Sequence, residues 1–262
     1  MLLGVYVRKN VANCQVAAGD AALFELLLVK GNVSDEGGKN RILLNDTYFI
    51  PWTPDEEQLK SLTSVIGSGG AGVKMSDGTL VFPLEGTKKE KDDTEEDEKA
   101  VSLILYLKDT NNWKLSKGMS DDGCSDPSVV EWKKDKKLIM MTACDGGRRR
   151  VYESGDMGDS WTEALGTLSR VWGNKQEGPE KGVGSGFITA TIEDRDVMLV
   201  TLPVYPKEEG GNPKGELHLW LTDNTHIVDI GPVSREGDDA AVSSLLYKSA
   251  GSGNELIALY EK

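Results

Sequence analysis

Ser154-Gly155-Asp156-Met157-Gly158-Asp159-Ser160-Trp161 has the pattern S-x-D-x-G-x-x-W, and this stretch decides the fold class. Its composition predicts a tight turn, because Asp156 can accept backbone N–H hydrogen bonds within it. Gly158 can adopt a positive φ angle, and Trp161 can pack into a hydrophobic core. We therefore expect a β-strand to end at Ser154 and another to begin near Trp161.

The same unit recurs along the chain: a short apolar strand, a polar turn and a second strand. Apolar residues that lie 58, 60 and 58 residues apart anchor the second strands, namely Leu80, Leu138, Met198 and Leu256. We expect these strands to begin over 79–82, 137–140, 197–200 and 255–258. The turns before them are rich in Asp, Gly, Asn and Ser, as hairpin connections are, and they cover 76–78, 133–136, 193–196 and 249–254.

A third and a fourth strand follow in three of these units. The third strands are expected over 101–107, 150–154 and 217–221, and the fourth strands near Trp113, Trp161 and Ile227. Four short strands per unit at even spacing predict a β-propeller. A propeller blade usually has about 40–50 residues, so the longer period implies insertions between strands. We place them in the polar segments 87–99, 172–185 and 205–215.

The number of units predicts an incomplete propeller. Three units are nearly whole, the last stops after its second strand, and the first begins within a blade at Leu2. We therefore expect residues 1–262 to form one partial all-β propeller domain, truncated at both ends, with roughly four blades present. A complete small β-sandwich is the alternative fold.

The charge balance disfavours several classes of function. The net charge is −13, and no stretch combines clustered Lys and Arg with aromatic residues, so we expect no nucleic-acid partner. No apolar run approaches the roughly 18 residues of a transmembrane helix, so we expect no membrane insertion by this chain. The apolar start, residues 1–6, is too short for a signal peptide and has no basic leader.

The cysteines and histidines argue against a metal site. Cys14, Cys124 and Cys144 form no C-x-x-C motif, and the two histidines, His218 and His226, do not cluster. We therefore expect no metal and no cofactor. One disulfide plus a free thiol, or buried free cysteines, both stay open for the three cysteines.

Several segments closely resemble the trypanosome trans-sialidase superfamily. They are 123–127, 151–161, 163–169 and 217–224, and the likeness extends over nearly the whole chain. The resemblance identifies Ser154, Asp156, Gly158 and Trp161 as an Asp box, a structural turn that lies away from the sugar site. It implies a six-bladed propeller and a location on the cell surface or outside the cell. In full-length members a lectin-like domain and a lipid anchor follow, and we expect neither of them within residues 1–262.

The resemblance also implies a mechanism for active members, which transfer sialic acid between glycans. A Glu activates a Tyr nucleophile, an Asp is the acid/base, and three Arg bind the substrate carboxylate. In this chain Val242 stands at the nucleophile position, Ala143 and Lys214 stand at two Arg positions, and Asn212 replaces an aromatic beside the acceptor sugar. Val has no nucleophilic atom, and Lys cannot make the planar fork of Arg. The resemblance places the third Arg and the acid/base Asp in the first blade, which we expect this chain to lack.

Three carboxylates stand at retained catalytic positions. Glu131 matches the Glu that pairs with the nucleophile, and Asp145 and Glu261 match two further acidic residues of the site. Solvated surface carboxylates are the alternative explanation. Loss of one member of a catalytic unit costs several orders of magnitude in rate, so we expect these three to be without function.

Four functions remain open. The favoured one is a catalytically degenerate surface glycoprotein, which serves in adhesion to host glycans or host surface and matrix proteins, or in immune display. Two glycosylation sequons, at Asn32 and Asn45, favour a secreted protein. The alternatives are a residual sialic-acid or galactose lectin, an active sialidase or trans-sialidase, and a truncated product without a stable fold.

Overall fold

The computed structural model describes residues 2–7, 24–34, 41–50, 61–89, 98–108, 112–172, 182–205, 214–250 and 253–262. Every element in these residues is a β-strand, which confirms the all-β prediction. Within the same residues, no helix has the length and apolar character to cross a membrane. The strands are β1 (Leu2–Val7), β2 (Phe24–Ser34), β3 (Arg41–Phe49), β4 (Leu62–Gly67), β5 (Val73–Lys74), β6 (Leu80–Lys89), β7 (Glu98–Leu107), β8 (Trp113–Leu115), β9 (Cys124–Trp132), β10 (Lys137–Cys144), β11 (Arg150–Ser154), β12 (Thr162–Glu163), β13 (Gly186–Ile192), β14 (Arg195–Val204), β15 (Glu216–Thr222), β16 (Ile227–Pro232), β17 (Ser243–Ala250) and β18 (Gly253–Tyr260).

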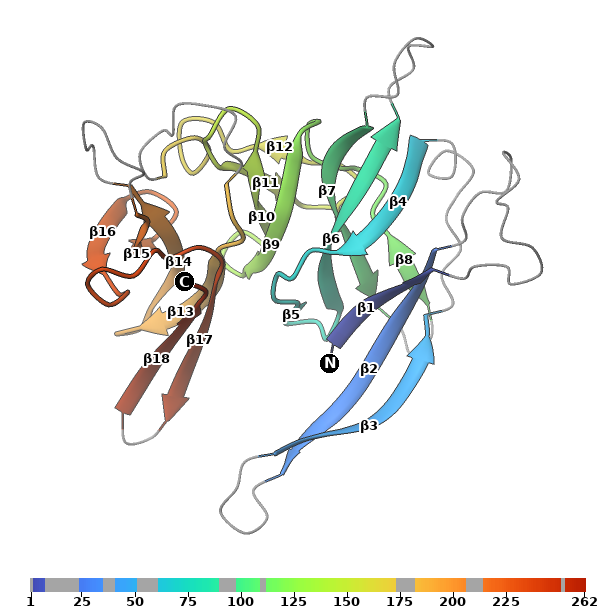
Figure 1. Cartoon of the computed structure of the whole chain (residues 1–262), viewed down its shortest axis with the longest axis horizontal. Helices are drawn as coiled ribbons and strands as arrows, with labels where there is room; N and C mark the ends of the chain where they lie inside the picture. The colour runs from blue at the N-terminus through green and yellow to red at the C-terminus, as the bar shows by residue number, and fades with distance from the viewer. Residues whose placement is uncertain are drawn as a thin grey trace, which may run out of the picture.

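The strands form antiparallel sheets that follow one another in chain order. β9 to β12 and β13 to β16 are four-stranded meanders, and β4, β6, β7 and β8 form a third sheet with β5 paired to β6. Figure 1 shows these sheets side by side around an arc, with the β1–β3 sheet at one end and the β17–β18 hairpin at the other. The first strands β9, β13 and β17 contact one another in turn. This is the arrangement of blades in a propeller.

The repeat spacing predicted the strands correctly from Leu80 onward. The four anchor residues lie on β6, β10, β14 and β18, and the expected third strands are β7, β11 and β15. The fourth strands β8, β12 and β16 begin at Trp113, Thr162 and Ile227. The β2–β3 hairpin precedes these anchors and was not predicted. The repeat has no anchor residue before Leu80 from which its position could be counted.

The charged segment 87–99 was predicted to be an insertion between strands, and this prediction is wrong at both ends. β6 continues to Lys89 and β7 starts at Glu98, and Lys88 pairs with Lys99 in the register. An antiparallel ladder satisfies the backbone groups of charged residues as well as those of apolar ones. Long charged side chains can still reach solvent from such a strand. Residues 90–97 lie outside the described residues.

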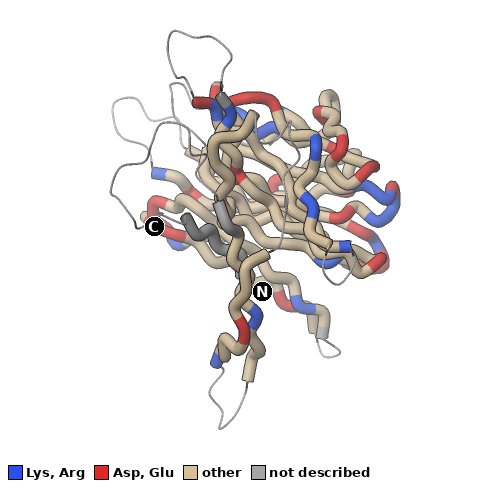
Figure 2. Tube along the Cα trace, turned by 90° about the vertical axis from the view of Figure 1, so that its right-hand side faces the viewer, with Lys and Arg blue, Asp and Glu red and all other residues tan. Residues whose placement is uncertain are grey.

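Hydrophobic clusters between successive sheets hold the blades together. Leu28 of β2 shares one cluster with Leu84 of β6. Trp132 of β9 shares another with Phe187 of β13, and further clusters join the remaining neighbouring sheets. Burial of apolar surface stabilises such contacts by roughly 25 cal/mol per Å². Figure 2 shows most of the acidic and basic residues toward the outside of the Cα trace.

Cys124 and Cys144 form a disulfide, so the first alternative holds for these two cysteines. They are direct partners in the register of β9 and β10, with their Cα atoms 4.0 Å apart. The bond therefore ties the start of β9 to the end of β10. Cys14 lies outside the described residues.

The Asp box has the geometry that its sequence predicts. Asp156 Oδ1 accepts a hydrogen bond from the Ser160 N–H at 2.9 Å, and Ser154 Oγ accepts one from the Gly158 N–H at 2.8 Å. Gly158 has a φ of +81°, and a Cβ there would lie 2.8 Å from Ser116 Cβ. This position therefore requires glycine, and the turn packs against the preceding sheet.

The next sheet uses the same device at the equivalent turn between its third and fourth strands. Asp223 Oδ1 accepts hydrogen bonds from the N–H groups of Thr225 and His226, at 2.9 and 2.7 Å. These bonds lower the pKa of the Asp223 carboxyl from 3.8 to about 2. The S-x-D-x-G-x-x-W pattern is absent here, so an acidic residue that caps this turn is the more general feature of the repeat.

Stability should depend on pH through Asp156. Hydrogen bonds from the Ser160 hydroxyl, the Ser160 N–H and the Ser154 hydroxyl lower the pKa of the Asp156 carboxyl from 3.8 to about 2. A lowered folded-state pKa contributes stability that is present above pH 3.8 and is lost as the pH falls through about 2. We expect wild type to melt higher than Asp156→Asn at neutral pH, and the difference to vanish near pH 2. Melting curves across this range measure it, with Asp159→Asn in the same turn as the control. A difference that stays constant with pH would contradict the assignment.

Candidate functional site

The starts of β9, β13 and β17 meet at one place, and Val242 lies there. The Ser243 N–H donates to Gly184 O at 3.1 Å, which holds Val242 beside the segment before β13. A Cβ on Gly184 would lie 3.3 Å from Val242 Cγ1 and 4.0 Å from Asp126 Oδ1. The carboxylate that lies near Val242 at Gly184 is thus that of Asp126. A Cβ on Gly184 would contact both side chains.

Asp126 has an unusual backbone. Its φ is +48°, although it precedes Pro127 and residues before proline prefer extended conformations. The Asp126 N–H donates to Glu85 Oε2 at 3.2 Å, and the Ser125 hydroxyl donates to Asp126 Oδ2 at 3.1 Å. Backbone strain of this kind clusters at functional sites, which makes Asp126 a candidate for the site.

Glu261 and Lys214 lie near Val242 through the backbone. The Glu261 N–H donates to Val242 O, and the Ala241 N–H donates to Glu261 O, both at 2.9 Å. The Ala240 N–H donates to Gly215 O at 2.7 Å, which brings the segment that contains Lys214 to the same strand end. Lys214 is exposed, and its ammonium donates to Gly237 O at 2.8 Å. Asn212 lies outside the described residues.

Ala143 and Arg149 both lie close to Gly182. Ala143 is buried on β10, and a Cβ on Gly182 would lie 3.0 Å from Ala143 Cβ and 3.8 Å from Arg149 Nη2. The Arg149 guanidinium donates a hydrogen bond to Val183 O. Burial lowers the pKa of Arg149 to about 10, against the opposing effects of Asp126 and Tyr205. Arg149 is therefore a protonated, desolvated cation at neutral pH.

Asp145 lies at the disulfide end of the same sheet. Its N–H donates to Gly123 O at 2.9 Å, and a Cβ on Gly123 would lie 2.4 Å from Asp145 Oδ2. Gly123 also has a φ of +79°. The Asp145 carboxylate thus closes over a glycine next to Cys124, and this contact gives it a local structural role.

Glu131 lies at the other end of β9, about 16 Å from Asp126 at the rise of a strand. It is only 6% exposed, and Ser76 donates two hydrogen bonds to its carboxylate, from the N–H at 2.8 Å and the hydroxyl at 2.5 Å. The structure therefore does not bring Glu131 to Val242. It joins the β5–β6 turn to β9 instead.

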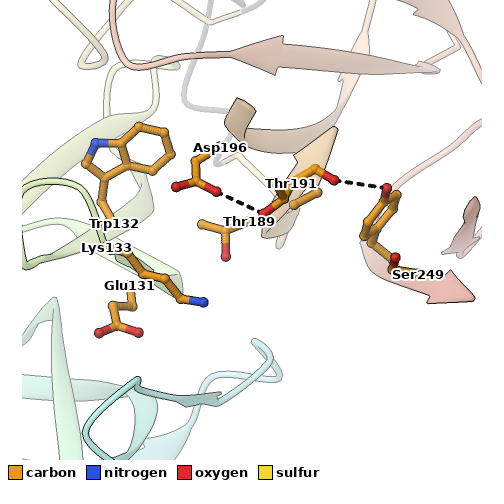
Figure 3. A pocket seen from close by; sticks show the side chains of 9 residues that line it. Glu131, Trp132, Lys133, Thr189, Thr191, Asp196 and Ser249 are labelled. Carbon is orange, nitrogen blue, oxygen red and sulfur yellow. Dashed lines mark hydrogen bonds between the residues drawn. The ribbon is translucent and has the colours of Figure 1, made fainter. Parts of the chain in front are cut away.

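Glu131 also lines a hollow of about 340 Å³, shown in Figure 3. Asp196 there accepts a hydrogen bond from the Thr191 hydroxyl at 2.9 Å, and the Tyr247 hydroxyl donates to Thr191 O at 3.3 Å. Lys133 reaches toward the hollow from the β9–β10 turn. The polar groups that line the hollow come from the ends of β9, β13 and β17 and the turns after them. Val242 lies at the opposite end, just before the start of β17. The hollow and the Val242 site are therefore two separate places.

Two residues of the Val242 site were missed by sequence reasoning. Asp126 stands in the segment that carries the resemblance, and an Asp-Pro pair beside a cysteine was the available signal. Arg149 is the middle of three consecutive arginines, and no sequence signal shows that it alone of the three is buried. Among the described residues, no group of three or more His, Cys, Asp or Glu side chains is placed to hold a metal ion.

The fold and the site together define a protein of the sialidase-like propeller class. The sheets are antiparallel and follow one another in chain order, an Asp caps the turn between third and fourth strands, and the site lies at the starts of the first strands. A family model described as a BNR repeat-like domain matches residues 1–261, and the chain belongs to this family, within the trans-sialidase-like superfamily.

Individual relatives agree with this assignment. A Trypanosoma cruzi sialidase is 37% identical over 249 residues, which cover 93% of this chain and 20% of the relative. Sialidase 85-1.1 of the same organism is 37% identical over 245 residues, which cover 87% of this chain and 30% of the relative. The chain thus spans less than a third of either protein.

Solved structures show the same fold. Trypanosoma rangeli sialidase in complex with the inhibitor DANA is 33% identical, with a TM-score of 0.75 over 98% of this chain and 40% of that one. The same sialidase in complex with sialic acid gives a TM-score of 0.73 and 33% identity, over 98% of this chain and 41% of that one.

Proposed function

We propose that this chain is a catalytically degenerate member of its superfamily that binds glycans ending in sialic acid or galactose and does not turn them over. The observation that carries the proposal is the side chain opposite Asp126. Val242 Cγ1 and Asp126 Oδ1 lie 3.3 and 4.0 Å from the position that a Cβ on Gly184 would take. An aliphatic side chain there has no oxygen for Asp126 to activate, so nucleophilic catalysis lacks its first atom.

The glycan partner rests on the relatives. Sialic acid and DANA are bound in the structures of the Trypanosoma rangeli sialidase, whose fold matches nearly all of this chain. A site that keeps its backbone geometry and loses its nucleophile is suited to binding without cleavage. Adhesion to host surface or matrix proteins and immune display are further uses of the same surface.

A cell-surface or extracellular location is part of the proposal. The Cys124–Cys144 disulfide supports it, because disulfides persist in oxidising compartments. Asn32 and Asn45 lie on β2 and β3 and are exposed, as glycosylation requires. In this proposal Asp126 takes the place of Glu131 as the carboxylate nearest the nucleophile position, and Asp145 and Glu261 are structural.

A fluorogenic sialoside tests the absence of turnover. We expect hydrolysis at least about 10⁴-fold below that of Trypanosoma rangeli sialidase assayed in parallel, because loss of a nucleophile removes a whole catalytic unit. A glycan array measures binding on the same preparation, and we expect dose-dependent signals on sialylated or galactose-terminated glycans. Hydrolysis within about tenfold of the control enzyme would show an active sialidase instead. A silent array would overturn glycan binding.

A further inference from the structure

The hollow of Figure 3 lies at the opposite end of the first strands from Val242 and has a volume of about 340 Å³. This size is at the lower end of the roughly 300–1,000 Å³ that small-molecule pockets have. Its lining comes from β9, β13, β14 and β17 and from the turns beside them. Lys133, Thr191, Asp196 and Ser249 in this lining are exposed, so a dissolved molecule can enter the hollow.

Asp196 offers a fixed acceptor to a molecule in the hollow. Its Oδ1 accepts a hydrogen bond from the Thr191 hydroxyl at 2.9 Å, which orients the carboxylate, and its Oδ2 has no donor among the described residues. An ionised carboxylate can accept about four hydrogen bonds, so Asp196 keeps most of its capacity for a ligand. Glu131 adds mainly negative charge, because it is only 6% exposed and Ser76 already donates to both of its oxygens.

Two further polar groups have no partner in the described part of the chain. They are the Lys133 ammonium, which can donate, and the Thr189 hydroxyl, which can donate and accept. Figure 3 shows the Lys133 side chain extending toward Thr189. A ligand with hydroxyl groups can satisfy both of them and Asp196 together, since each hydroxyl is both a donor and an acceptor.

Tyr247 gives the hollow an aromatic wall. Its hydroxyl donates to Thr191 O at 3.3 Å, and its ring packs against the buried cluster that includes Ala190 and Leu245. The ring is therefore held in one position before a ligand arrives, which lowers the entropic cost of binding. Aromatic side chains combined with a few oriented polar groups are the usual composition of a small-molecule site.

We infer that this hollow is a second sugar site, which binds a neutral hexopyranose. A pyranose ring carries several hydroxyl groups on a frame whose C–H bonds can pack against an aromatic ring. The hydroxyl groups match Asp196, Lys133 and Thr189, and the frame matches Tyr247. The hollow is separate from the Val242 site, so a sugar bound there does not depend on the glycan of the proposed function.

The charges of the hollow favour a neutral sugar over an acidic one. Glu131 and Asp196 are carboxylates and Lys133 is the one ammonium among the lining residues, which leaves a single net negative charge. An anionic sugar is repelled by this charge, whereas a neutral one is not. The hollow is therefore expected to discriminate against sugar acids, in contrast to a site for sialic acid.

Ligand-observed NMR on the whole chain tests the site with three neutral probes, the methyl pyranosides of galactose, glucose and mannose. We expect at least one of them to bind wild type. Asp196→Asn should weaken its binding about tenfold, because a hydrogen bond to a charged acceptor is lost, and Lys133→Gln should also weaken it. Asp194→Asn and Lys134→Gln are the matched controls, because both residues are exposed, lie beside the tested residues in the sequence and do not line the hollow. The controls should bind as wild type does, and all four variants should melt as wild type does.

The methyl glycoside of the corresponding uronic acid, in which a carboxylate replaces the CH₂OH group, measures the charge selection. It should bind wild type less tightly than the neutral probe. A uronide that binds as tightly or more tightly would indicate an anion site at Lys133 and overturn the inference. Absence of binding by all three neutral probes would also overturn it, as would equal affinity of wild type, Asp196→Asn and Lys133→Gln.

The same measurements separate this site from the proposed function. If the glycan array shows sialylated glycans and none of the neutral probes binds, the proposed function stands and the sugar site in the hollow is wrong. If a neutral probe binds through Asp196 and the array is silent, the sugar site stands and the proposed function is wrong.

Discussion

Replacement of both Cys124 and Cys144 by alanine should lower the free energy of unfolding by about 3 kcal/mol. The two cysteines are separated by 20 residues in the sequence, and a crosslink across a loop of this length restricts the unfolded chain. The bond also lies two residues from Asp126 and next to Ala143, so its loss should loosen the start of β9 at the Val242 site. Urea unfolding followed by circular dichroism measures the change.

The reductant supplies an internal check on this result. In dithiothreitol, wild type should lose its higher free energy of unfolding. Its unfolding curve should then approach that of the Cys124→Ala, Cys144→Ala variant. Cys14→Ala, which removes the third cysteine, is the matched control and should unfold as wild type does with or without reductant. A double variant that unfolds at the same urea concentration as oxidised wild type would show that the bond contributes nothing.

Much of the fold could be predicted from spacing alone, because every blade repeats the same two requirements. Each of these second strands has an apolar anchor such as Leu138, and the turns before β12 and β16 each have an Asp that accepts hydrogen bonds from backbone N–H groups. The cysteine pairing could not be predicted, since three cysteines allow three pairs. The pair is decided by the β9–β10 register, which makes Cys124 and Cys144 direct partners.

The candidate site was predicted in part. The β17–β18 hairpin brings Val242, just before β17, next to Glu261, just after β18. Ala143 lies in the same region. Glu131 and Asp126 are five residues apart on the same strand, and sequence similarity alone did not show which carboxylate reaches Val242. The length of β9 separates them, and only the position of β17 beside Gly184 selects Asp126.

Glu131→Ala should lower the free energy of unfolding by about 2 kcal/mol, because it removes the two hydrogen bonds that the exposed Ser76 donates to a buried carboxylate. Both hydrogen bonds join the β5–β6 turn to β9 of the next sheet, so the loss weakens the contact between two blades. Urea unfolding measures it. Asp196 lines the same hollow and is exposed, so Asp196→Asn is the control. We expect it to change the free energy of unfolding by less than about 0.5 kcal/mol.

Glu131→Gln separates a structural role from a role in ligand binding. The amide keeps one acceptor oxygen, so the stability loss should be smaller than that of Glu131→Ala, and sialoside affinity should equal that of wild type. The retained match to a catalytic Glu predicts the reverse: affinity would fall in Glu131→Gln while stability stays unchanged. Because Glu131 is buried under Ser76 and lies about 16 Å along β9 from Asp126, a ligand at Val242 cannot reach its carboxylate without opening the β5–β6 turn. A fall in affinity without a fall in stability would therefore place the glycan at the hollow of Figure 3 and not at Val242.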